Sequence, residues 1–224
     1  MPELTFQIQG VDPALSSAAP QLNLRILIKS ADPEALIQNI LLQCQIQIEP
    51  ARRRYEPAEQ KGLRDLFGEP ERWGKTLKPM LWTNTSGIIP PFTGQTVAEV
   101  PLPCTFDFTV AATKYFHGLK SGEIPICVLF SGTVFYAARD AAWQVERIPW
   151  NREASYRVPV STWKEMMDRH YPNTAWLCLR RDVFDQLHEY KVSHGIPTWE
   201  QAFENMLSIV EEGDLRSPVL KTHS

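Results

Sequence analysis

The 224-residue chain has four cysteines, and none of them stands in a pattern that marks a metal site or a disulfide framework. Cys44, Cys104, Cys127 and Cys178 lie far apart, with no C-x-x-C pair and no Cys/His cluster at zinc-finger spacing. Each sits in an apolar, strand-like segment, where a free cysteine packs as a small hydrophobic residue. We therefore expect reduced, mostly buried thiols, no bound metal and no cofactor.

The sequence also lacks a strong charge excess and a long apolar run. It has 23 Lys and Arg against 26 Asp and Glu, a net charge of -3, so no global basic excess draws it to nucleic acid or to an anionic membrane. No apolar run approaches the roughly 18 residues of a membrane-spanning helix, and the start of the chain lacks the pattern of a signal peptide. We expect a cytoplasmic protein with no nucleic-acid partner and no membrane insertion.

Short motifs of the common enzyme classes are missing as well. The sequence has no G-x-G-x-x-G, no Walker-type loop and no G-x-S-x-G elbow. An active site built from residues distant in sequence stays open as an alternative, and its candidates are His117, Asp107 and His170. Each also has a structural interpretation: His117 as packing, Asp107 as a solvated carboxylate on a strand, and His170 as a cation at the end of a helix.

Alternation of apolar and polar residues dominates the first 160 residues, as in Leu22, Leu24, Ile26 and Ile28. This period of two indicates strands with one face in the core and one in water, and the short connections favour an antiparallel sheet. The predicted strands cover residues 4–9, 22–29, 42–49, 96–102, 104–110, 124–130, 143–148, 154–158 and a short one near 175–179.

Helical spacing occurs in two short segments before Pro159 and becomes dominant after it. The predicted helices cover residues 56–67, 111–122, 161–170, 181–194 and 198–210, whereas residues 68–83 and 88–94 read as a turn-rich segment and a stiff loop. The expected fold is α+β. It comprises an antiparallel sheet or β-sandwich-like body over residues 1–160, a C-terminal helical portion over 161–212 packed on it, and a flexible tail over 213–224.

Three consecutive arginines follow the predicted strand 42–49, in the stretch CQIQIEPARRRYEP. Pro50 ends regular pairing and Pro57 suits a first helical turn, so Arg52, Arg53 and Arg54 are expected in a strand-to-helix connection. One interpretation, slightly favoured, is ordinary surface pairing with nearby glutamates (Glu49, Glu56 or Glu59) that contributes little energy. The other is that the arginines bind an acidic patch on a partner protein, because a guanidinium pairs well with carboxylates.

Aromatic residues next to turns are the other candidates for a contact surface. Trp73 and Phe92 stand beside turn residues, and exposed aromatic side chains are frequent in protein interfaces. Nucleic-acid binding through the three arginines together with Arg180 and Arg181 is a further alternative, which the net charge disfavours.

Seven segments, taken in order, resemble a bacterial family classed as a domain of unknown function. The likeness covers about Leu4 to Val210, and the segments are CQIQIEPARRRY, LFGEPERWGKTLKPMLWT, IPPFTG, PLPCTFDFTVAATKYFHGL, GEIPICVLFSGTVF, IPWNREASYRVPV and MDRHYP. Genes of that family often lie beside those of high-affinity nickel–iron hydrogenases. The resemblance therefore implies a non-enzymatic accessory or assembly factor whose protein partner is a hydrogenase subunit or maturation protein. The sequence leaves the oligomeric state open.

Overall fold

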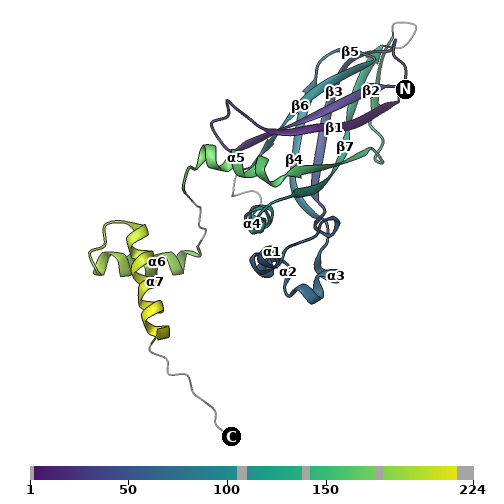
Figure 1. Ribbon diagram of the computed structural model, residues 1–224. Coiled ribbons are helices and arrows are strands. Elements are labelled where there is room, and N and C mark those ends of the chain that lie inside the picture. Colours follow the sequence, from purple (N-terminus) through teal and green to yellow (C-terminus); the bar gives the residue numbers. More distant parts are fainter. Residues whose placement is uncertain (1–2, 105–109, 138–141, 175–178, 216–224) are drawn as a thin grey trace. The chain divides into compact units, whose positions relative to one another are not determined.

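The computed structural model describes residues 3–104, 110–137, 142–174 and 179–215, and the chain forms two compact units (Figure 1). The first unit spans Met1–Thr174 and holds the strands and helices α1 to α5. The second spans Ala175–Ser224 and holds helices α6 and α7. The division falls after the helix that begins at Val160, so that helix belongs to the unit that contains the strands.

Two antiparallel sheets make the body of the first unit. The strands are β1 (Leu4–Pro13), β2 (Gln21–Ser30), β3 (Leu36–Ile48), β4 (Met80–Ile89), β5 (Phe92–Thr93), β6 (Gln95–Pro103), β7 (Glu123–Ala137), β8 (Trp143–Arg147) and β9 (Glu153–Pro159). One sheet has the order β1-β2-β6. The other has the order β4-β3-β7-β8, with β5 paired to β3 and β9 paired to β7.

The inward faces of both sheets contribute to one hydrophobic core, as the alternation predicts. Leu22, Leu24, Ile26 and Ile28 of β2 are fully buried, as are the alternate residues of β3 from Ile40 to Ile48. The α+β fold with a two-sheet body and C-terminal helices is thus confirmed.

Short helices lie at one end of the sheets in the first unit (Figure 1). They are α1 (Pro57–Gly62), α2 (Arg64–Phe67), α3 (Trp73–Thr76), α4 (Val110–Gly118) and α5 (Val160–His170), with 3₁₀ turns η1 (Pro50–Arg52) and η2 (Pro70–Arg72). Aromatic contacts join α4 and α5 to the core: the ring centroids of Phe116 lie 5.0 Å from Trp82 and 5.3 Å from Trp163.

Strand β4 is the main element that the sequence pattern missed, because residues 68–83 and 88–94 read as turns and loop. Its inward positions opposite Ile46, Cys44 and Leu42 of β3 hold Thr83, Thr85 and Gly87. Such small or polar residues fit here because β6 approaches closely: a Cβ on Gly87 would lie 3.5 Å from Val100. No hydrophobic alternation therefore marks this strand in the sequence.

Several other elements begin or end at residues that differ from expectation: β3 already begins at Leu36, and β7 continues to Ala137. Val110, expected to end a strand, begins α4, and residues 105–109 and 175–178 of the expected strands lie outside the described part of the chain. Helix α5 begins at Val160 with Pro159 at its N-cap and no side-chain cap, although Ser161 and Thr162 resemble a capping signal. The fixed φ of proline already sets the direction in which the chain enters this helix.

The second unit is a pair of helices, α6 (Arg181–Ser193) and α7 (Trp199–Leu215). Aromatic packing joins them, with the Phe184 and Trp199 ring centroids 5.3 Å apart. Thr198 caps α7 by accepting a hydrogen bond from the Gln201 N–H at 3.2 Å. Leu207 is 63% exposed in this unit, and the expected packing of the helices on the body stays a prediction.

Gly132 in the middle of β7 is required by its backbone. Its φ is +138°, and a Cβ at this position would clash with the carbonyl oxygen of Leu41 on β3. We expect Gly132→Ala to lower the free energy of unfolding by at least about 2 kcal/mol, measured by urea denaturation. Gly74→Ala on α3, where a Cβ meets open space, is the control, and we expect it to change stability by less than about 1 kcal/mol. Equal effects of the two substitutions would contradict the steric argument.

Candidate functional site

The three arginines occupy the connection between β3 and α1, as the sequence predicts. Strand β3 ends at Ile48, η1 follows over Pro50–Arg52, Arg53 is extended (φ -131°, ψ 162°), and α1 begins at Pro57. Because the backbone changes conformation at each of these residues, the three side chains point in different directions. The connection thus separates the roles of Arg52, Arg53 and Arg54.

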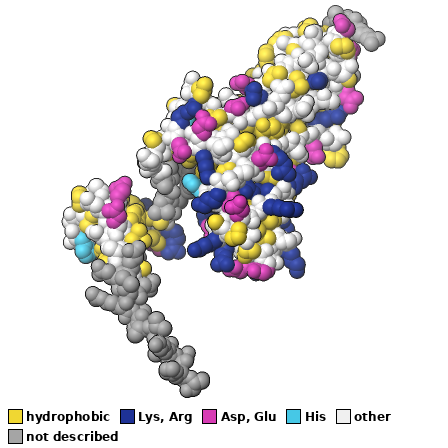
Figure 2. All heavy atoms as spheres, viewed as in Figure 1, with side chains coloured by type: hydrophobic (Ala, Val, Ile, Leu, Met, Phe, Trp, Pro, Cys, Tyr) yellow, Lys and Arg dark blue, Asp and Glu magenta, His cyan; other side chains and the backbone are white. Residues whose placement is uncertain are grey.

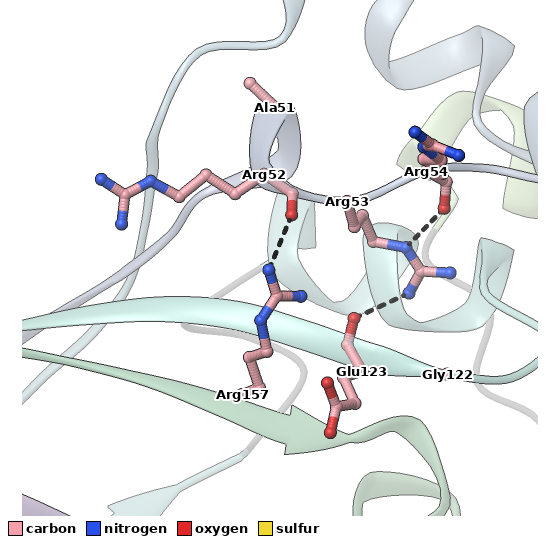
Figure 3. Close-up of a pocket in the computed structure, with 7 residues that line it drawn as sticks. All are labelled: Ala51, Arg52, Arg53, Arg54, Gly122, Glu123 and Arg157. Atoms are coloured by element: carbon pink, nitrogen blue, oxygen red, sulfur yellow. Dashed lines mark hydrogen bonds between the residues drawn. The ribbon is translucent and has the colours of Figure 1, made fainter.

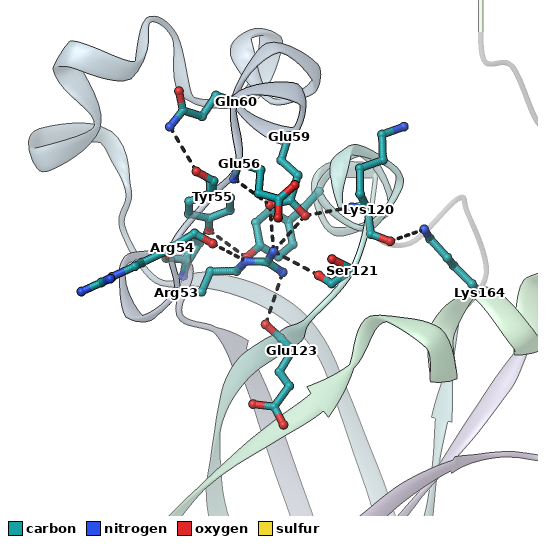
Figure 4. Close-up of polar contacts among 12 residues, drawn as sticks. Arg53, Arg54, Tyr55, Glu56, Glu59, Gln60, Lys120, Ser121, Glu123 and Lys164 are labelled. Carbon is teal, nitrogen blue, oxygen red and sulfur yellow. Dashed lines mark hydrogen bonds and ion pairs between the residues drawn. The ribbon is translucent and has the colours of Figure 1, made fainter.

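Arg53 points into the protein and its side chain is only 8% exposed (Figure 4). Its Nη2 donates to both carboxylate oxygens of Glu59, at 2.9 and 3.0 Å, and to the carbonyl oxygen of Ser121 at 3.2 Å. Its Nη1 donates to the carbonyl oxygen of Glu123 at 3.2 Å, and its Nε to that of Arg54 at 3.3 Å. This one guanidinium therefore joins the β3–α1 connection to α1 and to the segment that leads into β7.

Glu59 is the buried partner of this ion pair, with its side chain 2% exposed. Its carboxylate also accepts the backbone N–H of Lys120 at 2.8 Å and that of Glu56 at 3.2 Å. Burial alone would raise the pKa of the Glu59 carboxyl, but these two N–H groups and the Arg53 guanidinium outweigh it and hold the pKa below its usual range. Glu59 is therefore ionised at neutral pH and fully hydrogen-bonded.

Two tyrosines lie beside the ion pair. The Arg53 guanidinium lies 5.0 Å from the centre of the Tyr55 ring, a cation–π contact. The Tyr55 hydroxyl donates to the carbonyl oxygen of Pro50 at 2.8 Å, and it lies 2.9 Å from the Tyr115 hydroxyl of α4. Burial raises the pKa of Tyr115 to about 12, and burial likewise raises that of Tyr55. Both hydroxyls are thus neutral hydrogen-bonding groups that fix the connection to α4.

The expectation of ordinary surface pairing holds for Arg52 but not for Arg53. Arg52 is exposed, and its Nη1 lies 2.9 Å from the Glu49 carboxylate. The Arg53–Glu59 pair is buried instead, because the chain reverses after Arg53 and brings α1 over its side chain. Buried pairs differ from surface pairs in that removal of one partner leaves an uncompensated charge in the interior.

Arg52 and Arg54 line an open depression together with an arginine from a distant strand (Figure 3). The depression has a volume of about 740 Å³ and is lined by Ala51, Arg52, Arg53, Arg54, Gly122, Glu123 and Arg157. Arg157 comes from β9 and its Nη2 donates to the backbone oxygen of Arg52 at 3.2 Å. Figure 3 shows the Arg52 side chain extending away from Arg54, with the Arg157 guanidinium below Arg52.

Arg54 and Arg157 are exposed, and within the described part of the chain no carboxylate forms an ion pair with either of them. Among the described residues of the lining, Glu123 is the one that is acidic. Dark-blue Lys and Arg side chains gather around the short helices that follow β3 in the space-filling view (Figure 2). The depression is therefore locally cationic in a protein whose net charge is -3.

Arg157 is the site residue that sequence reasoning missed. In the segment EASYRVP it takes an ordinary outward position of a strand, which carries no signal of its own. Only the pairing of β9 with β7, in which Arg157 lies opposite Pro125, brings it to the arginines that follow β3.

Of the two aromatic candidates for a contact surface, Trp73 is buried and Phe92 is half-buried. Trp73 is 7% exposed, its ring packs against Tyr55 at 5.1 Å and Phe67 at 5.9 Å, and its Nε1 donates to the Gly68 carbonyl oxygen. Phe92 lies in β5 and packs half-buried against the core. Neither residue lines the arginine depression.

The alternative active-site residues are not joined in the structure. His117 packs edge-on against Trp163 with ring centroids 4.9 Å apart, and burial lowers its pKa. His170 ends α5, and its ring Nε2 is buried with no hydrogen-bond partner among the described residues. No hydrogen bond, ion pair or ring contact joins the two histidines, and Asp107 lies outside the described residues.

Three of the cysteines fall within the described residues, and all three are free thiols: Cys44 and Cys104 are buried and Cys127 is half-buried. Over residues 3–104, 110–137, 142–174 and 179–215, no group of three or more His, Cys, Asp or Glu could hold a metal ion. None of the helices in these ranges is long and apolar enough to cross a membrane.

A family model described as "Family of unknown function (DUF6084)" matches residues 1–214. The chain belongs to this family. A search of curated proteins found no match. The family model covers almost the whole sequence. The expectation that the chain belongs to a family of unknown function is therefore confirmed, and that family is DUF6084.

Solved structures similar to this DUF6084 chain share little sequence with it. The CARDB domain of the PF1109 protein from Pyrococcus furiosus, in complex with di-metal ions, has 12% identity and a TM-score of 0.28, over 70% of this chain and 92% of that one. A late embryogenesis abundant protein has 12% identity and a TM-score of 0.32, over 71% and 72% of the two chains. β-Glucosidase 3B from Thermotoga neapolitana has 10% identity and a TM-score of 0.24, over 69% and 17%. Similarities this weak support no statement about function.

The buried pair makes Arg53 and Arg54 unequal despite their adjacency. We expect Arg53→Ala to lower the free energy of unfolding by about 3–5 kcal/mol, because Glu59 would be left charged and buried. Arg54→Ala, the matched control, should change it by less than about 0.5 kcal/mol, because its side chain is exposed. Urea denaturation measures both, and a cost below about 1 kcal/mol for Arg53→Ala would show that the pair does not hold the connection.

Glu59 should also make stability depend on pH. Its folded-state pKa lies below the unfolded value of about 4.3, so the unfolded state binds more protons in the acidic range. The contribution of Glu59 to stability is thus fully present above about pH 5 and is lost as the pH falls through the folded pKa. Urea denaturation at several pH values should show the difference between wild type and Glu59→Gln shrinking toward low pH. Glu69→Gln, which removes an exposed carboxylate, should keep the wild-type dependence, and parallel curves for wild type and Glu59→Gln would contradict this.

Proposed function

We propose that this DUF6084 chain is a non-enzymatic accessory or assembly factor that binds a protein partner through the arginine depression. The observation that carries the proposal is the meeting of Arg52, Arg54 and Arg157, from two distant parts of the sequence, around one open concave surface. Guanidinium groups pair with carboxylates through two parallel hydrogen bonds, so an acidic segment of a partner protein is the ligand that suits them.

The arrangement favours an extended acidic segment over a small anion. The Arg52 side chain extends away from Arg54 (Figure 3), so the two guanidinium groups do not converge on one point. An extended chain with several carboxylates could contact them in succession. The buried Arg53–Glu59 pair fixes the backbone between β3 and α1 that carries these arginines. Binding therefore loses less conformational entropy than it would at a flexible loop.

The identity of the partner rests on the resemblance to the bacterial family encoded beside high-affinity nickel–iron hydrogenases. On that basis, we propose that the partner is a hydrogenase subunit or a hydrogenase maturation protein, held during assembly. Acidic patches on such a partner would supply the complementary potential, which speeds association and selects the partner more than it adds affinity.

The test is capture of the partner by tagged protein in its own host, with the recovered proteins identified by mass spectrometry. We expect a hydrogenase subunit or maturation protein with the wild type, and a loss of at least about tenfold in recovery with the triple variant Arg52→Ala, Arg54→Ala, Arg157→Ala. Raising the salt concentration should weaken wild-type capture, because charge pairs at an exposed surface are screened.

The control for this experiment removes the same charge elsewhere. Lys29, Arg72 and Arg181 are exposed and lie on three separate elements, so changing all three to Ala alters the net charge without clearing one surface. The control variant should capture the partner as the wild type does. Undiminished capture by the depression variant, or equal loss in both variants, would exclude the depression as the binding site.

A further inference from the structure

Strand β8 leaves one edge of its sheet open. It pairs with β7 along one side, and no strand of the described residues pairs with its other side. The other edge strands of the two sheets lie near each other. Arg152, just before β9, forms an ion pair with Glu3 beside β1 at 2.9 Å. Thr85 of β4 donates to the Pro101 carbonyl oxygen of β6. An open edge presents unpaired N–H and C=O groups that another strand can bind.

The register identifies the backbone groups on this open edge. The Ile148 N–H donates to the Gly132 carbonyl oxygen at 3.0 Å, so these two residues are a hydrogen-bonded pair. The next pair along the two strands is Arg147 and Thr133. In an antiparallel ladder, hydrogen-bonded and non-hydrogen-bonded residues alternate. Residues 144 and 146 therefore bond toward β7, whereas Trp143, Val145 and Arg147 direct their N–H and C=O groups outward.

The same three residues carry side chains that stand in solvent. Trp143 is 62% exposed, Val145 is 58% exposed, and Arg147 is exposed as well. They share the outer face of the sheet with Phe135, which lies directly opposite Val145 on β7. Exposed apolar residues on an unpaired edge strand are characteristic of a pairing surface.

We propose that β8 pairs in antiparallel fashion with β8 of a second copy of this chain, centred on Val145. In this register Val145 faces its own counterpart, and the outward groups of residues 143, 145 and 147 form a continuous ladder of backbone hydrogen bonds. Trp143 lies opposite Arg147 of the second copy, which gives a cation–π contact at each end. Gln144 lies opposite Glu146 of the second copy, an amide beside a carboxylate.

The complementarity of this pairing is what selects a second copy as the occupant. When two copies of the sequence WQVER pair in antiparallel fashion about the valine, no two like charges lie opposite each other and no charge lies opposite the valine. The pairing also joins the outer face of this sheet in one copy to the same face in the second copy. On each of them Leu41 (44% exposed) and Ile88 (74% exposed) continue the apolar surface, since they lie opposite each other on β3 and β4.

The test uses residue 145, which must meet itself if the proposal holds. By sedimentation equilibrium, the wild-type mass should rise with concentration from 25.6 kDa toward twice that value. Val145→Lys and Val145→Glu should each remain monomeric over the same range, because two like charges would face each other. An equimolar mixture of the two variants should recover the dimer, because the introduced ammonium would then face the introduced carboxylate.

A backbone variant tests the hydrogen-bond ladder separately. Val145→Pro removes an N–H that points away from β7, so the fold should tolerate it as it tolerates proline on an edge strand, while dimer formation is lost. Val97→Lys on β6, at a residue 52% exposed, is the control and should dimerise like the wild type. The triple arginine variant should also dimerise, which separates this proposal from the proposed function.

Three results would overturn the proposal. They are a wild type that stays monomeric at all concentrations, a Val145→Lys variant that still dimerises, and a mixture of the two charge variants that does not recover the dimer.

Discussion

The buried ion pair between Arg53 and Glu59 is the interaction on which the candidate site depends. Arg53 donates five hydrogen bonds, which join the connection after β3 to helix α1 and to the segment that leads into β7, a part of the chain distant in the sequence. Desolvation of two charges is costly, and here it is offset because the carboxylate also accepts two backbone N–H groups. The pair therefore fixes the shape of the connection in which all three arginines lie.

A fixed connection gives neighbouring arginines different roles. The guanidinium of Arg53 is buried on Glu59, so it contributes to stability, whereas Arg54 is exposed to solvent and lines the depression. A protein with a net charge of -3 can still present a locally cationic surface. Dissolved salt screens charges that lie more than about 10 Å apart, so a partner responds mainly to the charges close to its binding site. The local arrangement matters more for a partner than the total charge does.

The two proposed surfaces differ in physical character and in position within the first unit. The arginine depression lies at the η1 end of β3 and uses charge, whereas the β8 edge uses backbone hydrogen bonds and apolar contact. A partner protein at one and a second copy at the other would not compete for the same residues. Substitutions at Arg54 and at Val145 can therefore be interpreted separately, since distant, unconnected sites contribute nearly independently.

By itself, the sequence determined the strands whose alternation is strong, such as β2 and β3, the helical part after Pro159, and the place of the arginines between Pro50 and Pro57. These features follow from local periodicity and from the fixed φ of proline, which the chain encodes over a few residues. Only the tertiary structure decided that Arg53 is buried on Glu59, that Arg157 joins Arg52, that Trp73 is core, and that Thr83, Thr85 and Gly87 belong to a strand. Each of these depends on which distant segment lies opposite, and no pattern within one segment contains that information.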